Sequence, residues 1–117
     1  MTYEEFKEKV SSVILTDDGN CPVTPVVQML QDKWKLQILY ELCIKCPMRF
    51  GELKKVLKPI TNTALTNALK ELEADELIQR IQYNEMPLRV EYSLTEKGRD
   101  LLPVFYAISQ WGMKYIP

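Results

Sequence analysis

The stretch ITNTALTNALKELEADELIQRIQYNEMPLRVEYSL, from Ile60 to Leu94, decides the fold of this 117-residue chain. In its first half, apolar residues recur at helical spacing, with Asn, Thr and Lys on the opposite side. Its second half holds two runs of alternating apolar and polar residues, 78–83 and 89–94, around a tip that contains Pro87. The stretch therefore predicts an amphipathic helix followed directly by a β-hairpin.

The predicted amphipathic helix has a polar outer face that suits the edges of DNA bases. Thr61 is expected to cap the helix, since a threonine hydroxyl can accept a hydrogen bond from an amide of the first turn. Asparagine can bond the edge of adenine, and threonine can donate, accept or contact a thymine methyl group. The apolar stripe consists of Leu65, Ala68, Leu69 and Leu72. The side chains expected to contact bases are Asn62, Thr63, Thr66 and Asn67.

Two further helices are predicted ahead of this stretch. Asp32 is expected to cap the first, KWKLQILYELCIK, which ends at Pro47. The second is a two-turn helix over 50–57, closed by Pro59. Its side chains expected to point inward are Phe50, Leu53, Val56 and Leu57. A short helix, a turn with proline and a polar-faced helix form a helix-turn-helix pattern, in which the hairpin would be a wing.

Positive charge is concentrated in the same part of the chain. The net charge is −1, but residues 45–71 hold six Lys or Arg against two Glu, a local charge of +4 that leaves −5 for the rest. A basic segment on an acidic body can attract DNA with one face only, although an ordinary solvated surface would also carry such charges. The residues expected to contact the DNA backbone are Arg49, Lys54, Lys55, Lys58, Thr61, Lys70 and Arg89.

The flanking segments are also predicted to be helical. Residues 2–15 form an amphipathic pattern and 17–20 a loop, after which a short helix is expected with Thr24 as its cap. A single final helix is expected to begin at the cap residue Thr95. The predicted order is five helices, two strands and one helix, which is a mostly helical member of the α+β class and fits one domain.

Composition argues against several classes of protein. No apolar run reaches the roughly 18 residues that read as a transmembrane helix, and the charged start lacks the apolar core of a signal peptide. Three cysteines without a secretion signal predict a reducing cytoplasm. The chain has no histidine, phosphate-binding glycine loop or nucleophile motif. We therefore expect no enzyme, no metal site and no cofactor.

Six blocks occur in an order that is typical of one family. They are CPV at Cys21, DKWKLQIL at Asp32, MRFGELKK at Met48, ITNTALTNALKELEADELI at Ile60, MPLRVEYSLTEKGRDLLPV at Met86 and WG at Trp111. The block RVEYSLTEKG is especially specific. With these blocks, which span most of the chain from 21 to 112, the sequence resembles the HxlR-type winged helix-turn-helix transcriptional regulators, relatives of the MarR group.

The resemblance implies a bacterial or archaeal homodimer that binds double-stranded DNA at a pseudo-palindromic operator. It implies that the helix from Thr61 recognises DNA and that residues 79–93 form the wing. Trp34 and Phe50 would lie in the core, and Trp111 at or near the dimer interface. The implied single winged-helix domain spans 1–117, with an N-terminal arm and helix over 1–20, a winged-helix core over 21–94 and a C-terminal dimer helix over 95–117.

The chain departs from the family pattern at three places. Gln31 and Asp32 stand where the family commonly has two glycines, which alters only a turn. Glu76 stands where a glycine is usual, and a left-handed helix stop there is less comfortable for glutamate. Asn67 and Ala68 replace the Arg or Gln often found in the recognition helix, which bears on the operator sequence.

The cysteines allow a further hypothesis. Cys21 matches an N-terminal cysteine that some members of the family use to sense oxidants or electrophiles, and a helix start beside it would lower the pKa of its thiol. The alternative is an inert cysteine in a structural turn. Cys43 and Cys46 form a CxxC motif at a helix end, where Cys43 continues an apolar row and is expected to belong to the core.

Two other functions remain open at the level of sequence. The chain could be a winged-helix module that binds protein and touches DNA weakly or not at all, because the recognition helix lacks Arg and the net charge is acidic. It could also respond to a small molecule in a pocket between the dimer helices, lined by Tyr106, Trp111 or Tyr115, although plain packing is the favoured explanation of those aromatic residues.

Overall fold

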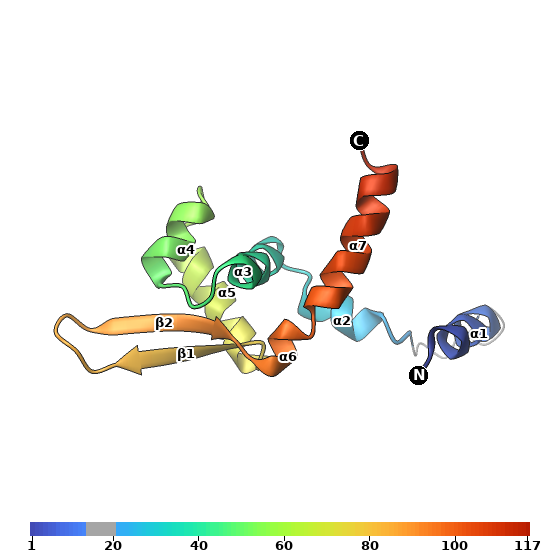
Figure 1. The fold of residues 1–117 in the computed structure, drawn as a ribbon, viewed down its shortest axis with the longest axis horizontal. Coiled ribbons are helices and arrows are strands. Elements are labelled where there is room, and N and C mark those ends of the chain that lie inside the picture. The colour runs from blue at the N-terminus through green and yellow to red at the C-terminus, as the bar shows by residue number, and fades with distance from the viewer. Residues whose placement is uncertain (14–20) are drawn as a thin grey trace.

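A computed structural model describes residues 1–13 and 21–117, with the side chains of 11–13 excepted (Figure 1). The predicted loop at 17–20 and the end of the first predicted helix lie outside the described residues. Along the chain the elements are α1 (Tyr3–Val13), α2 (Thr24–Met29), α3 (Lys33–Ile44), α4 (Phe50–Val56), α5 (Asn62–Ala74), β1 (Ile78–Tyr83), β2 (Arg89–Leu94), α6 (Glu96–Arg99) and α7 (Leu102–Tyr115). The fold is the predicted winged helix, mostly α, with a two-stranded antiparallel wing.

The hydrophobic core lies where α3 and α5 meet the hairpin. Helix α5 contacts α3 and β1, while β2 contacts α3, α4 and α6. Trp34 and Phe50, the two predicted core aromatics, are partly buried and pack against this core, as does Cys43. Truncating one of the buried leucines to alanine would cost about 2–5 kcal/mol. The most deeply buried side chains are those of Ile38, Leu39, Leu42, Leu53, Leu65, Leu69, Leu72 and Leu77.

The hairpin has the strand limits that the alternation predicts. Ile78 pairs with Leu94 at its base, and Tyr83 pairs with Arg89 near its tip. Met48, just ahead of α4, adds a single bridge to β2. Its amide donates to the Tyr92 carbonyl at 3.0 Å, and the Tyr92 amide donates back at 2.8 Å. This bridge anchors the start of α4 to the wing.

Three of the predicted helix caps, those at Asp32, Thr61 and Thr95, are confirmed and one is displaced. The Asp32 carboxylate accepts from the Trp34 amide at 2.7 Å, and the Thr61 hydroxyl accepts from the Ala64 amide at 3.1 Å. The cap of α2 is Val23 rather than Thr24, and no side chain caps that helix. Pro25, which follows, tolerates a place in the first turn because those amides have no helical partner.

Two other expectations were wrong. Val56 does not point inward: half of its side chain is exposed, because α4 ends there and Leu57 takes the buried position. The single final helix is two helices, α6 and α7, which meet at Asp100 and Leu101. Thr95 does cap the first of them, accepting from the Gly98 amide at 3.0 Å.

The terminal helices project from the core, which makes the chain elongated (Figure 1). The molecule measures 61 × 32 × 24 Å with a radius of gyration of 17.3 Å, whereas a compact chain of this length would have about 13 Å. Neither α2 nor α7 contains a buried residue. Within residues 1–13 and 21–117, no helix is long and apolar enough to cross a membrane.

Candidate nucleic-acid interface

Helix α5 presents the predicted polar face to solvent. Its apolar stripe is fully buried, so the helix can rotate little about its axis and its outer face is fixed. Lys70 extends the same exposed face toward the C-terminal half of the helix. Of the four predicted base-contacting side chains, Asn62, Thr63 and Asn67 are exposed and Thr66 is half-buried. The structure thus brings all four to one open surface.

A hydrogen bond joins that face to the preceding helix. The ammonium of Lys54 donates to the side-chain oxygen of Asn62, at the first residue of α5. The bond leaves the NH₂ group of the Asn62 amide available to an acceptor outside the protein. Lys54 therefore orients Asn62 and brings positive charge to the beginning of α5.

Four more of the predicted backbone-contacting residues lie in α4 or in the short segments on either side of it. Arg49, Lys55, Lys58 and Thr61 are all exposed. The amide of Arg49 donates to the carboxylate of Glu52 at 3.1 Å, which fixes the beginning of α4. Lys45 also bonds Glu52, so the pKa of that carboxyl is lowered, first by Lys45 and then by the Arg49 amide. Helix α4 is thus ordered at the end that carries Arg49.

A partly buried ion pair holds α5 against α3. Lys35 is almost entirely buried on α3, and its ammonium lies 2.6 Å from the carboxylate of Glu71 on α5. The sequence did not indicate that Lys35 would be buried, because a lysine in a predicted amphipathic helix is ordinarily solvent-exposed. The pair adds a polar constraint to the apolar packing between the two helices.

Helix α5 ends in a left-handed turn at Glu76, as predicted from the glycine that the family usually has at this position. Glu76 has φ 60°, and its amide donates to the carbonyl of Glu73 at 2.9 Å. The amide of Leu77 reaches back to the carbonyl of Leu72 at 3.0 Å. These two bonds form a Schellman motif, with the buried Leu72 and Leu77 as its apolar pair. The turn directs the chain sharply from α5 into β1.

Arg89, the wing residue predicted to contact a phosphate, is bound to other side chains of the wing. The guanidinium of Arg89 lies 3.1 Å from the carboxylate of Glu85 and 3.9 Å from that of Glu91, and it stacks 3.9 Å from the ring centre of Tyr83. The side chain is only 30% exposed. Contact with a phosphate would require Arg89 to share or leave these partners.

Arg80 is a basic wing residue that the sequence reasoning missed. It is exposed on β1 and donates to the Gln82 side chain at 3.3 Å. Its place in an alternating strand indicates that it faces solvent. It lies outside the basic segment 45–71, to which the count of positive charge was limited. Among the described residues, no carboxylate forms an ion pair with Arg80.

Cys21 is an exposed thiol with altered acidity. The Thr24 side chain and, to a smaller degree, the backbone amides of Val23 and Thr24 lower the pKa of this thiol. Burial raises the pKa of Cys43, with a further contribution from Cys46. The structure thus confirms the predicted direction for Cys21 and assigns it to hydrogen bonds from the start of α2.

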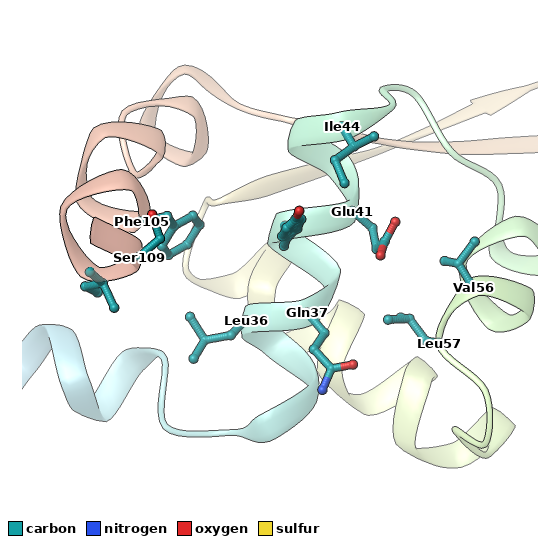
Figure 2. A pocket seen from close by; sticks show the side chains of 10 residues that line it. Leu36, Gln37, Glu41, Ile44, Val56, Leu57, Phe105 and Ser109 are labelled. Carbon is teal, nitrogen blue, oxygen red and sulfur yellow. The ribbon is translucent and has the colours of Figure 1, made fainter. Parts of the chain in front are cut away.

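An apolar cavity of about 540 Å³ lies along the outer face of α3 (Figure 2). Leu36 and Ile44 line it from α3, Val56 from α4, and Phe105 and Ser109 from α7. Of the aromatic residues expected to line a ligand pocket, Tyr106 lines an adjoining cavity of about 390 Å³. Trp111 and Tyr115 line neither cavity and instead contact each other, with ring centres 5.2 Å apart. The ligand pocket was expected between helices of two chains, so its lining by these three residues stays a prediction.

Comparison with known proteins identifies the relatives of this arrangement. A family model described as HxlR-like helix-turn-helix matches residues 29–117. An uncharacterized HTH-type transcriptional regulator of Halalkalibacterium halodurans is 40% identical over 114 residues, which are 97% of this chain and 96% of the relative.

Two solved structures share the fold. A transcriptional regulator of the MarR family from Porphyromonas gingivalis W83 is 38% identical with a TM-score of 0.75, and the match covers 85% of this chain and 96% of that one. The redox regulator HypR in its oxidized form is 38% identical with a TM-score of 0.73, and the match covers 83% of this chain and 99% of that one.

Proposed function

Because this chain belongs to the HxlR-like helix-turn-helix family of transcriptional regulators, we propose that it binds a pseudo-palindromic operator as a homodimer. The observation that carries the proposal is the outer face of α5. Amide and hydroxyl side chains are exposed along this face, and the buried apolar residues on the opposite side of α5 fix the orientation of the helix. Such a helix fits the major groove, whose base edges these groups can bond.

The residues divide into two roles in this proposal. Asn62, Thr63, Thr66 and Asn67 contact base edges. Arg80 is added to the backbone contacts because it is exposed on the wing. Arg89 contributes where it can share its carboxylate partners. The remaining backbone contacts are Arg49, Lys54, Lys55, Lys58, Thr61 and Lys70.

Exposed apolar side chains on α7 support the homodimer. The helix has 14 residues and none is buried. Ile108, Trp111 and Met113 are each more than 60% exposed. Several large apolar side chains left exposed along one helix indicate an association site, because leaving them in water is unfavourable. On α1, Tyr3 and Val10 are exposed as well. A dimer through α1 and α7 would place two copies of α5 in successive major grooves about 34 Å apart.

We further propose that oxidation or alkylation of Cys21 alters operator binding. Cys21 is exposed and its thiol pKa is lowered, which raises the fraction of reactive thiolate at neutral pH. The relative HypR is a redox regulator. A change of charge or bulk at Cys21 would act beside α2, which lies between α1 and α3 in the chain.

Selection of bound duplexes from a random DNA pool, with and without diamide, tests the proposal. We expect an enriched inverted repeat whose binding weakens steeply with salt, since neutralised phosphates release counterions. In the parent, diamide should abolish the enrichment. Cys21→Ser should still enrich the repeat in diamide, whereas Cys46→Ser, the control at a second exposed cysteine, should lose the enrichment as the parent does. If neither condition enriches a repeat, the protein-binding alternative replaces operator binding.

A further inference from the structure

The segment after the wing is bonded to the C-terminal end of α5 at three consecutive carbonyls. The Thr95 hydroxyl donates to the Glu76 carbonyl at 2.6 Å, and the Thr95 amide donates to the Leu77 carbonyl at 3.1 Å. The ammonium of Lys97 donates to the Asp75 carbonyl at 2.7 Å. The carbonyl of Asp75, the C-cap residue, has no partner within the helix, so Lys97 satisfies a group that α5 leaves open, while Thr95 bonds the carbonyls of the two residues that follow. The positive charge of Lys97 also opposes the negative end of the α5 dipole.

Gly98 allows the two segments to approach this closely. A Cβ atom at position 98 would lie 2.1 Å from the carbonyl oxygen of Leu77. No side chain fits at that distance, so any other residue would push α6 away from the end of α5. The Gly98 amide also donates to the Thr95 hydroxyl. The first turn of α6 therefore rests directly on the Schellman turn.

The contact continues into α7 without a flexible linker (Figure 1). Asp100 and Leu101 join α6 to α7, and both have helical backbone angles. The Asp100 amide bonds the Glu96 carbonyl at 3.0 Å, and the Phe105 amide bonds the Leu101 carbonyl at 2.9 Å. Leu101 and Phe105 also pack against the core. The joint is thus a short helical turn fixed on both sides.

We propose that Thr95, Lys97 and Gly98 are positioning residues, here called the clamp, which fix the orientation of α5 relative to α7. In the dimer the clamp sets the separation of the two copies of α5, and hence the operator spacing that the protein prefers. This consequence for DNA rests on the proposed function, whereas the orientation within one chain does not.

The first test measures spacing preference. The parent and Thr95→Val proteins are titrated with the selected repeat and with repeats lengthened or shortened by one base pair at the centre. We expect the parent to discriminate by about tenfold and Thr95→Val by about threefold or less. Thr95→Ser keeps the hydroxyl and should retain the parental ratio. Loss of folded protein alone would weaken binding to every spacing equally and leave the ratio unchanged.

Lys97→Met provides a second variant that keeps most of the side chain and removes the bond to Asp75 together with the positive charge. Like Thr95→Val, it should reduce the ratio of affinities for the selected repeat and for the repeats of altered spacing. Lys33→Met, a loss of one exposed lysine on α3, is the matched control and should not. Gly98→Ala is expected to be the most disruptive change, but it is not needed for the conclusion because it can prevent folding.

The second test needs neither DNA nor a dimer. Spin labels carried by non-natural amino acids at Lys70 on α5 and Gln110 on α7 report the distance between the helices, with labelled chains diluted into unlabelled ones. We expect a narrow distance distribution in the parent and in Thr95→Ser, and a broader one in Thr95→Val. A distribution that stays narrow in folded Thr95→Val would overturn the clamp. Broadening without any enriched repeat would support the clamp and contradict operator binding.

Discussion

Replacing Glu76 by glycine should stabilise the protein, because Glu76 holds a backbone conformation that suits glycine. Its φ of 60° makes it the one non-glycine residue with positive φ in the described part of the chain. The side chain is exposed, so its removal costs little packing. The Schellman bonds come from the backbone and remain available to glycine.

The expected gain follows from two opposing contributions. The left-handed conformation costs an L-residue about 1–2 kcal/mol, which glycine avoids. Glycine also has more freedom in the unfolded chain, which returns about 0.5–1 kcal/mol. The net gain is then about 0.5–1 kcal/mol, or an increase of roughly 2–6 °C in Tm for a domain of this size.

Urea and thermal unfolding at one fixed protein concentration measure the change, since association would otherwise shift the midpoint. Glu76→Ala removes the carboxylate but keeps the strain, so it should stay near the parent. Asp75→Gly is the matched control at φ −82° and should lose about 0.5–1 kcal/mol. The reasoning is refuted if Glu76→Gly is no more stable than Glu76→Ala, or if both glycine variants gain equally.

Four further predictions concern binding, reactivity and pH. Asn67→Ala should weaken binding to the selected operator by about 1–3 kcal/mol and leave random DNA unaffected, and an equal loss on both would show that Asn67 reads no base. Lys55→Met should weaken binding to all sequences alike and reduce the slope of log K against log salt by about 1, so a sequence-dependent loss would remove Lys55 from the phosphate contacts. Iodoacetamide should alkylate Cys21 at a lower pH than in Thr24→Val, which loses the largest cause of the lowered thiol pKa, and identical pH–rate profiles would contradict that assignment. The lowered pKa of Glu52 means that its carboxylate stabilises the fold above the ordinary carboxyl pKa of about 4.3 and loses this effect as pH falls through the folded value. Glu52→Gln should therefore be less stable than the parent at pH 7, with a difference that disappears in acid unfolding titrations; a difference that persists in acid would have another cause.

Much of the local structure could be predicted because it depends on residues close together in the chain. Alternation gave both strands with their limits, and the spacing of Leu65, Leu69 and Leu72 gave the buried side of α5. The cap at Thr61 and the left-handed turn at Glu76 follow from local hydrogen bonds and backbone sterics. The same periodicity also indicated which side of α5 would face solvent.

The sequence by itself therefore determined the order of the main elements and the candidate recognition surface. Only the tertiary structure decided that Arg89 is held by Glu85, Glu91 and Tyr83, that Lys35 is buried against α5, and that the segment from Thr95 bonds the end of α5. It also decided that α7 covers little of its own core. The physical reason is that periodicity identifies an apolar or polar face of one element, whereas the partner of that face depends on the packing of distant segments. An apolar helix such as α7 has the same sequence pattern whether it covers its own chain or a second one.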